Sequence, residues 1–180
     1  MSGENATPFS RKLRTETIGE GKSGSVEANA AERNAIARLL DLVALDRLVF
    51  VYRLTLSSGH RLRMAGRLCA SVVQTCVVSL DPVPSELNVP VDTEFWPEGA
   101  FAALEKNAEV DPGASLLEWP EPIKDGTIDL GKVVYETLAT SLDPYPKKAG
   151  ASFEWSEGPP AEATSRGSGP FAALERLKRQ

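Results

Sequence analysis

Alternating apolar and polar residues give the middle of the chain its clearest β pattern. Even positions from residue 48 to 56 are apolar, and after Ser57-Ser58-Gly59-His60 the even positions from 62 to 68 are apolar or glycine. This alternation predicts two half-buried strands joined by a hairpin turn. A two-residue loop would mix the faces, whereas a three-residue loop over residues 58–60 keeps the apolar residues together. The pairs that this loop predicts are Leu56 with Leu62, Leu54 with Met64, and Phe50 with Leu68.

The same register gathers four arginines on the opposite face of the hairpin. They are Arg53, Arg61, Arg63 and Arg67. Because a guanidinium group can bind phosphate through two parallel hydrogen bonds, this row is our candidate RNA-binding surface. The nearby aromatic residues Phe50 and Tyr52 face the core and offer no stacking surface there. Arginines on the solvent side of a half-buried sheet are also common simply as solubilising residues.

Further extended segments predict an antiparallel meander around this hairpin. Residues 71–80 are β-branched and apolar, the Pro-containing segment 81–84 forms a turn, and residues 87–95 alternate again. Phe9 to Leu13 alternates apolar and basic residues, which predicts an edge strand that joins the sheet. The Gly/Ser/Lys-rich segment 20–25 is typical of a loop. We predict about four strands in the meander and a fifth from the N-terminal segment.

Two segments carry the pattern of capped amphipathic helices. Asn29 followed by Glu32 has the spacing of a capping box, and apolar residues at helical spacing predict a helix over residues 30–43. Its apolar face consists of Ile36, Leu39, Leu40 and Val43. Asp129 can cap a second helix, which Pro144 prevents from continuing. The apolar stripe of this second helix consists of Leu130, Val133, Val134, Leu138 and Leu142. A short helix over residues 101–106 and an irregular connection over residues 110–126 separate the sheet from it.

These elements predict an α+β protein, with a partly closed antiparallel sheet of about five strands packed by two main amphipathic helices. We expect one domain over residues 1–148, a mobile Gly/Pro/Ala/Glu-rich linker over 149–169 and a short helical tail over 170–180. No apolar run approaches the roughly 20 residues of a membrane-spanning helix. Residues 1–8 are polar and lack the apolar stretch of a secretion signal. We therefore expect a cytoplasmic protein. We also expect a monomer.

Charge is distributed unevenly along the chain, although the net charge is only −5. Residues 1–80 carry 11 Lys and Arg against 7 Asp and Glu, residues 81–165 carry 5 against 17, and residues 166–180 carry 4 against 1. The basic first half suits phosphate or an acidic partner, whereas the acidic middle suits a basic protein and repels nucleic acid. Solubility alone explains both charges equally well.

The residue inventory offers little for catalysis, metal binding or a cofactor. The one histidine, His60, falls in the predicted turn, so neither a histidine triad nor a multi-histidine metal site is expected. The Gly-Lys-Ser at residues 21–23 lacks the first glycine and the preceding strand of a phosphate-binding loop. Cys69 and Cys76 are an odd number of residues apart on one predicted strand, so they should face opposite sides and form no disulfide. We predict no catalytic site, metal site or cofactor, and therefore no enzymatic activity.

Short motifs in a fixed order along nearly the whole chain give the sequence a family resemblance. In chain order they are Phe9-Ser10-Arg11, Glu32-Arg33, Gly66 to Cys76, Ile128-Asp129-Leu130-Gly131 with Glu136, Pro144-x-Pro146, and Pro170-Phe171 with Leu174 and Leu177. With these motifs the chain resembles the bacterial YceD family, the large ribosomal RNA subunit accumulation proteins, long catalogued as a domain of unknown function. The positions that carry the resemblance are Cys76, Asp129, Leu130, Gly131, Glu136, Pro144, Pro146, Pro170 and Phe171.

The resemblance implies a non-enzymatic ribosome-biogenesis factor needed for the synthesis, processing or stability of 23S rRNA. Its implied partners are pre-ribosomal large-subunit RNA, a large-subunit ribosomal protein, or both, with no membrane and no small-molecule substrate. Many members carry C-x-x-C in the middle strands. The corresponding segment here, Val73-Gln74-Thr75-Cys76, has one cysteine, so a four-ligand zinc site is not implied. The alternative is a protein-only adaptor that binds a basic ribosomal protein or processing factor through its acidic segment, residues 81–165.

Overall fold

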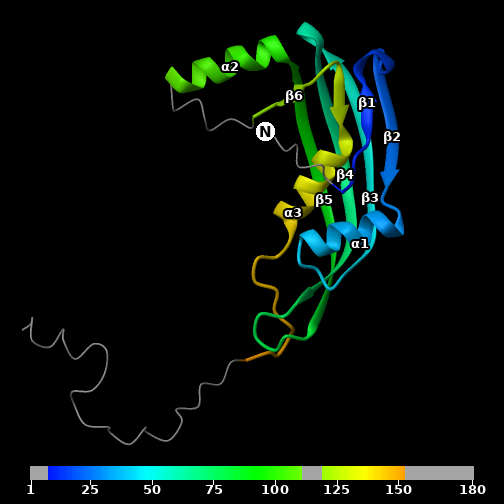
Figure 1. Cartoon of the computed structure of the whole chain (residues 1–180), viewed down its shortest axis with the longest axis vertical. Coiled ribbons are helices and arrows are strands. Elements are labelled where there is room, and N and C mark those ends of the chain that lie inside the picture. The colour runs from blue at the N-terminus through cyan, green and yellow to red at the C-terminus, as the bar shows by residue number, and fades with distance from the viewer. Residues whose placement is uncertain (1–7, 111–118, 153–180) are drawn as a thin grey trace, which may run out of the picture. The chain divides into compact units, whose positions relative to one another are not determined.

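The computed structural model describes residues 8–110 and 119–152, and its helices and strands all belong to the unit formed by residues 1–149. The main sheet has five strands in the order β2-β3-β4-β5-β6, and β1 pairs with β7 in a separate two-stranded sheet. The main-sheet strands are β2 (Gly21–Glu27), β3 (Ala44–Ser57), β4 (Arg61–Thr75), β5 (Pro82–Pro97) and β6 (Glu121–Ile123). The remaining strands are β1 (Lys12–Arg14) and β7 (Thr127–Asp129), and the α-helices are α1 (Ala30–Leu39), α2 (Glu98–Val110) and α3 (Leu130–Ser141) (Figure 1).

The hairpin of β3 and β4 has the predicted register. Its loop is the three-residue 3-10 turn Ser58–His60, in which Gly59 adopts a positive φ of 72°. The observed pairs include Leu56 with Leu62, Leu54 with Met64, and Phe50 with Leu68. The requirement that apolar residues share one face was therefore sufficient to set the register.

The meander contains three long strands and not four. Residues 61–75 form one continuous strand, β4, so the segments 62–68 and 71–80, which we counted separately, belong to one strand as far as residue 75. β5 begins at Pro82, earlier than predicted, and pairs in parallel with β6 only through residues 95–97. Along most of its length β5 is thus an edge strand, which explains how it tolerates several prolines that cannot donate a ladder hydrogen bond.

The strand that pairs with the outer side of β3 is β2, and not the N-terminal segment that we predicted as the fifth strand. Residues 21–27, most of which we predicted as a loop, pair antiparallel with β3. The glycines there serve packing, because a Cβ atom at Gly24 would lie 2.8 Å from the Tyr52 hydroxyl oxygen. The predicted N-terminal strand is shorter than expected, and it pairs with β7 as Lys12 with Asp129. The α+β class is confirmed, and the sheet is open, with β2 and β6 as its two edges.

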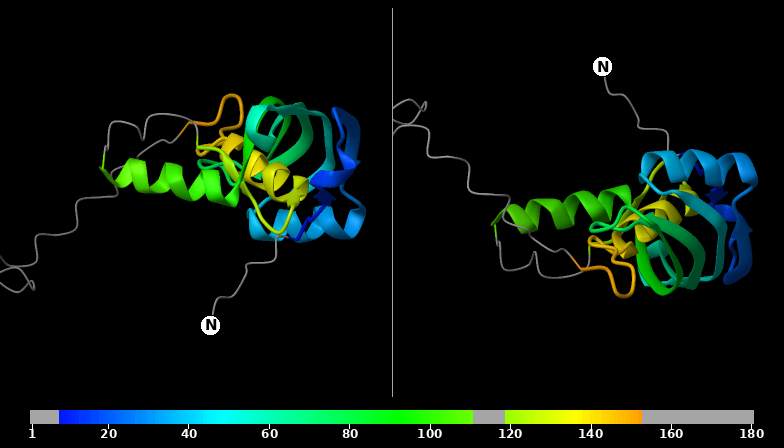
Figure 2. Two further views of the ribbon diagram at one scale, coloured as in Figure 1. Left: turned by 90° about the horizontal axis from the view of Figure 1, so that it is seen from above. Right: turned by 90° about the horizontal axis from the view of Figure 1, so that it is seen from below.

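The helices α1 and α3 lie on the same side of the main sheet (Figures 1 and 2). The capping box of α1 is present, but the helix ends at Leu39, before a positive φ of 52° at Asp41. Leu39 and Val43 are therefore exposed, and their assignment to the apolar face is wrong, whereas Ile36 is fully buried. α3 is capped by Asp129 as predicted. The buried residues of its stripe are Leu130, Val133, Val134 and Leu138.

The connection between the sheet and α3 contains more structure than predicted. α2 spans Glu98–Val110 and not only residues 101–106, and β6 lies within the segment predicted as irregular. Residues 111–118, most of the predicted linker over 149–169, and the predicted tail over 170–180 lie outside the described residues. Within the described part of the chain, no helix is long and apolar enough to span a membrane.

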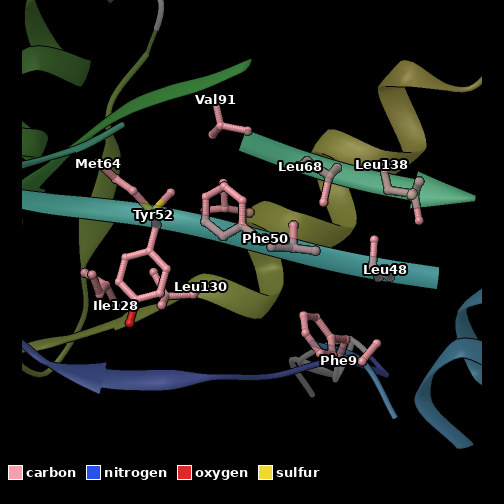
Figure 3. Close-up of a cluster of buried hydrophobic side chains, with 14 of the residues drawn as sticks. Phe9, Leu48, Phe50, Tyr52, Met64, Leu68, Val91, Ile128, Leu130 and Leu138 are labelled. Atoms are coloured by element: carbon pink, nitrogen blue, oxygen red, sulfur yellow. The ribbon is translucent and has the colours of Figure 1, made fainter. Parts of the chain in front are cut away.

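The hydrophobic core lies between the main sheet and the layer formed by α3, β1 and β7 (Figure 3). Phe50 and Tyr52 point inward from β3, and their rings stack with centroids 5.9 Å apart. Phe9 reaches the same core from the N-terminal segment and is 1% exposed. Because these contacts fill most of the core-facing side of the sheet, the charged side chains of β3, β4 and β5 that face solvent lie on the opposite side.

Candidate nucleic-acid interface

The four predicted arginines occupy the solvent side of the sheet. Register pairs Arg67 with Val51, Arg53 with Ala65, Arg63 with Thr55 and Arg61 with Ser57. All these residues are at odd positions, and their even neighbours form the core, so the side chains share the outer face. Arg53, Arg63 and Arg67 are exposed, and Arg61 is half-buried.

Arg63 is engaged by a carboxylate from β5. Its Nε donates to Asp92 Oδ1 at 2.9 Å, and its Nη2 donates to Asp92 Oδ2 at 2.5 Å. This bidentate contact raises the pKa of Arg63 and lowers the pKa of Asp92. Both side chains are about half exposed, so water screens the pair and its contribution to stability is small.

The other arginines of the row have weaker partners or none. Arg61 lies over the indole ring of Trp96, with its guanidinium carbon 3.7 Å from the ring centroid. Arg67 donates to the neutral side chain of Asn88 at 2.8 Å. Arg53 makes no side-chain hydrogen bond or ion pair with any residue that the structure describes. Arg53 and Arg67 are therefore the members of the row with no carboxylate partner among the described residues.

Charge changes across the outer face from one strand to the next. Even positions of β5 pair with odd positions of β4, which brings Glu86, Asp92 and Glu94 onto this face beside the arginines. On the other side of the arginines, Ser23 and Ser25 of β2 lie opposite Arg53 and Val51. The face is thus acidic on β5 and basic on β3 and β4, while β2 carries two serines and, at its end, the carboxylate of Glu27.

Sequence reasoning missed one cationic residue of this face. Arg47 pairs with Ser71 beyond a register shift between Leu45 and Arg47, which places it on the outer side. It is exposed and forms no ion pair with a described residue. We began the strand at residue 48, although the odd position of Arg47 was the signal that could have identified it. The carboxylate partner of Arg63 was not foreseeable, because it required the β4–β5 register.

Several family-motif residues form a clasp between the N-terminal segment and α3. Asp129 Oδ1 accepts hydrogen bonds from the backbone N–H groups of Arg11 and Gly131, at 2.7 and 2.9 Å. Its Oδ2 accepts a bond from Ser10 Oγ at 2.6 Å, and the Leu130 N–H donates to the Arg11 carbonyl at 3.1 Å. These contacts join two family motifs that are more than 110 residues apart in the sequence.

The clasp extends to α1 through Arg11. Its Nη1 and Nη2 donate to the two carboxylate oxygens of Glu32 at 2.7 and 2.8 Å. Glu32 also accepts from the Asn29 N–H, which completes the capping box. The contact with Arg11 lowers the pKa of Glu32 and raises the pKa of Arg11.

Another motif residue, Glu136, is half exposed and lies 3.7 Å from Lys132 in an ion pair on the surface of α3.

Cys76 and Pro146 meet at the turn that follows β4. The buried Cys76 Sγ accepts hydrogen bonds from the N–H groups of Val78, Ser79 and Lys148, each at 3.4 Å. The bond from the Lys148 backbone is the largest cause that lowers the pKa of Cys76 to about 6. The Val77 N–H donates to the Pro146 carbonyl at 2.9 Å. The thiol thus acts as a hydrogen-bond acceptor that holds the turn against the segment after α3.

Both cysteines are free, as predicted, although Cys76 lies just beyond the end of β4 and not within the strand. Among the described residues, no group of three or more His, Cys, Asp or Glu side chains could hold a metal ion. Pro144 is exposed, and Pro170 and Phe171 lie outside the described residues.

Comparison with known proteins identifies a family to which the sequence is similar. Residues 64–178 match the family model described as large ribosomal RNA subunit accumulation protein YceD. No curated protein and no solved structure matches the chain.

Proposed function

Since this chain belongs to the YceD family, we propose that it is a non-enzymatic factor in the accumulation of large-subunit ribosomal RNA and that it binds pre-ribosomal RNA directly. The family description concerns RNA accumulation, and it leaves the binding surface and the partners open. The surface that we assign to RNA is the arginine row of β3 and β4.

The observation that carries this proposal is the uncompensated positive charge on the solvent side of the sheet. Arg53 and Arg47 have no side-chain partner among the described residues, and Arg67 has only a neutral one. Guanidinium groups without a carboxylate partner remain available for bidentate contacts with phosphate. We expect the RNA backbone to lie over β2, β3 and β4, because the β5 carboxylates repel phosphate.

The arginine row therefore divides into two kinds of residue. Arg53 and Arg67 are the principal phosphate ligands, and Arg47 extends them along β3. Arg63 is occupied by Asp92, and Arg61 is stacked on Trp96. Ser23 lies directly opposite Arg53 on β2, where its hydroxyl adds a donor at the edge of the basic strip.

A double charge reversal tests the proposal. The variant Arg53→Glu/Arg67→Glu should bind a large-subunit rRNA fragment at least about tenfold more weakly. The slope of log affinity against log salt concentration should become shallower by about two, because two phosphate contacts are lost. The measurement is a filter-binding or fluorescence titration at several salt concentrations. The matched control, Lys12→Glu/Lys124→Glu, changes the net charge equally at exposed lysines outside the arginine row. Equal losses in both variants, or no loss in either, would reject the arginine row as the RNA-binding surface.

The acidic residues of β5 support the protein-only adaptor as a second candidate function. Glu86, Asp92 and Glu94 share the outer face and could bind a basic ribosomal protein without RNA. Nuclease treatment separates the two functions, because a protein-only adaptor keeps its co-purifying ribosomal partners after the RNA is digested. An RNA-binding factor loses them.

A further inference from the structure

A cleft of about 560 Å³ opens near the hairpin end of the main sheet. It is bounded by the segment between β1 and β2, the β3–β4 hairpin, the start of α2, and the β6–β7 turn. The residues that matter here are Glu16, Leu56, His60, Leu62, Glu98 and Asp125. None of them belongs to the arginine row.

The floor of the cleft is apolar. Leu62 and Ile123 contribute to it from β4 and β6, and they are 2% and 8% exposed. Leu56 lies at its side and is 51% exposed. Pro97 adds a rigid apolar edge where β5 passes into α2. The cleft can therefore hold an aliphatic chain out of water.

The rim of the cleft is acidic and electrostatically unbalanced. Glu16, Glu98 and Asp125 line it and are exposed, and no lysine or arginine is among the lining residues. None of the three carboxylates makes a hydrogen bond or ion pair with another residue in the described part of the chain. By contrast, Asp92, Glu32, Glu121 and Asp81 each have a cationic partner. The three rim carboxylates are thus available to a cation from outside.

Two rim residues also adopt a backbone conformation that most side chains avoid. His60 and Asp125 have positive φ angles of 58° and 50°, and the neighbouring Gly126 has a φ of 64°. Non-glycine residues in this region cost free energy, and they persist where the surrounding structure imposes them. At these two positions the backbone conformation is set by the β3–β4 loop and the β6–β7 turn.

We infer that this cleft binds a lysine or arginine side chain from an extended basic segment of a partner protein. The methylene groups of the incoming side chain lie against Leu62 and Ile123, and its charged end meets the rim carboxylates. A nucleic acid is not the occupant, because the three carboxylates repel phosphate. This inference does not depend on RNA binding by the arginine row, and the two surfaces share no residue.

The test uses the full chain and a fluorescein-labelled short peptide of alternating lysine and serine. Wild-type protein should bind this peptide saturably, and the same peptide with acetylated lysines should not bind. In the variant Glu16→Gln/Glu98→Gln/Asp125→Asn, affinity should fall about tenfold, because three exposed ionic contacts are lost. Asparagine suits the positive φ at residue 125. Leu56→Asn, which keeps every rim charge, should also weaken binding.

The control variant Glu27→Gln/Asp41→Asn/Asp46→Asn removes the same number of charges from exposed positions that do not line the cleft. It should bind the peptide within about twofold of wild type. Equal losses in both triple variants would show unspecific attraction and overturn the inference, as would tight binding of the acetylated peptide. As a measurement on unmodified protein, the amide NMR signals of Gly19 and Gly126 should shift on peptide addition, and unchanged signals would also overturn it. RNA binding should be unchanged in the cleft variant, which separates this inference from the proposed function.

Discussion

At the scale of single residues, Gly131 decides how closely the N-terminal segment approaches α3. A Cβ atom at this position would lie 2.3 Å from the Phe9 carbonyl oxygen and 2.7 Å from Ser10 Cα. These neighbours are backbone atoms held by the hydrogen bonds of Asp129 with Ser10 and Arg11, so they cannot move away independently. The absence of a side chain at residue 131 is therefore what allows the clasp to close.

We predict that Gly131→Ala lowers the free energy of unfolding by about 1–3 kcal/mol, because the added methyl group overlaps the Phe9 backbone. Urea unfolding followed by circular dichroism measures the change. Gly99→Ala is the matched control, since its added Cβ meets nothing within 4 Å in α2. This control should be neutral or raise stability by about 0.5 kcal/mol. Equal stability of Gly131→Ala and wild type would contradict the close approach.

At the scale of elements, local patterns predicted well and long-range pairings did not. The caps at Asn29 and Asp129 depend on residues two or three positions away, so they were visible in the sequence. The β3–β4 register followed from neighbouring apolar positions. In contrast, β2 has glycine and serine at positions where a strand is not expected, and only its pairing with β3 makes it one. The partners of Arg63 and Cys76 come from distant segments, so no local signal could identify them.

Cys76 Sγ joins the turn after β4 to the segment after α3, and its strength as a hydrogen-bond acceptor depends on pH. Three N–H groups bind Cys76 Sγ, and the pKa of Cys76 is about 6, compared with 9.0 for an ordinary thiol. The folded protein therefore releases this proton at a lower pH than the unfolded chain does. The resulting stabilisation grows as pH rises from about 6 to 9, and it is lost as pH falls through the folded-state value.

We predict that Cys76→Ala lowers the free energy of unfolding by about 1–3 kcal/mol above neutral pH, because three backbone donors lose their acceptor. The difference from wild type should be smaller near about pH 5.5 than near about pH 8.5. Urea unfolding of both proteins at the two pH values measures this, with Cys69→Ala as the control. A difference that does not change with pH would show that Cys76 stays protonated in the folded protein.

At the scale of the whole described domain, the main sheet has two sides with different roles. One side is covered by α1 and α3 (Figures 1 and 2) and holds the core. The other presents charged side chains from β3, β4 and β5. On the outer side, the arginines of β4 and the carboxylates of β5 together determine the electrostatic potential at the surface. Asp92 is central to this balance because it both neutralises Arg63 and repels phosphate.

We predict that Asp92→Asn strengthens binding of a large-subunit rRNA fragment by several-fold, because it frees Arg63 and removes a negative charge from the face. Titration at several salt concentrations should show a steeper salt dependence than wild type. Asp125→Asn is the control, because it changes the net charge equally but lies at the cleft. It should leave RNA affinity unchanged, and an unchanged affinity in Asp92→Asn would argue against RNA contact through this face.

The turn that begins at Cys76 has a consequence for how the sequence can evolve. Its sulfur is bound by main-chain donors, which every residue except proline provides, so Val78 can change to another side chain without loss of its bond. Ser79 is more constrained, because its side chain also forms hydrogen bonds with Cys76 and Asp81. Position 76 itself requires a compact, polarisable acceptor. Cysteine meets this requirement, so the closure of the turn is by itself a sufficient reason to find one at this position.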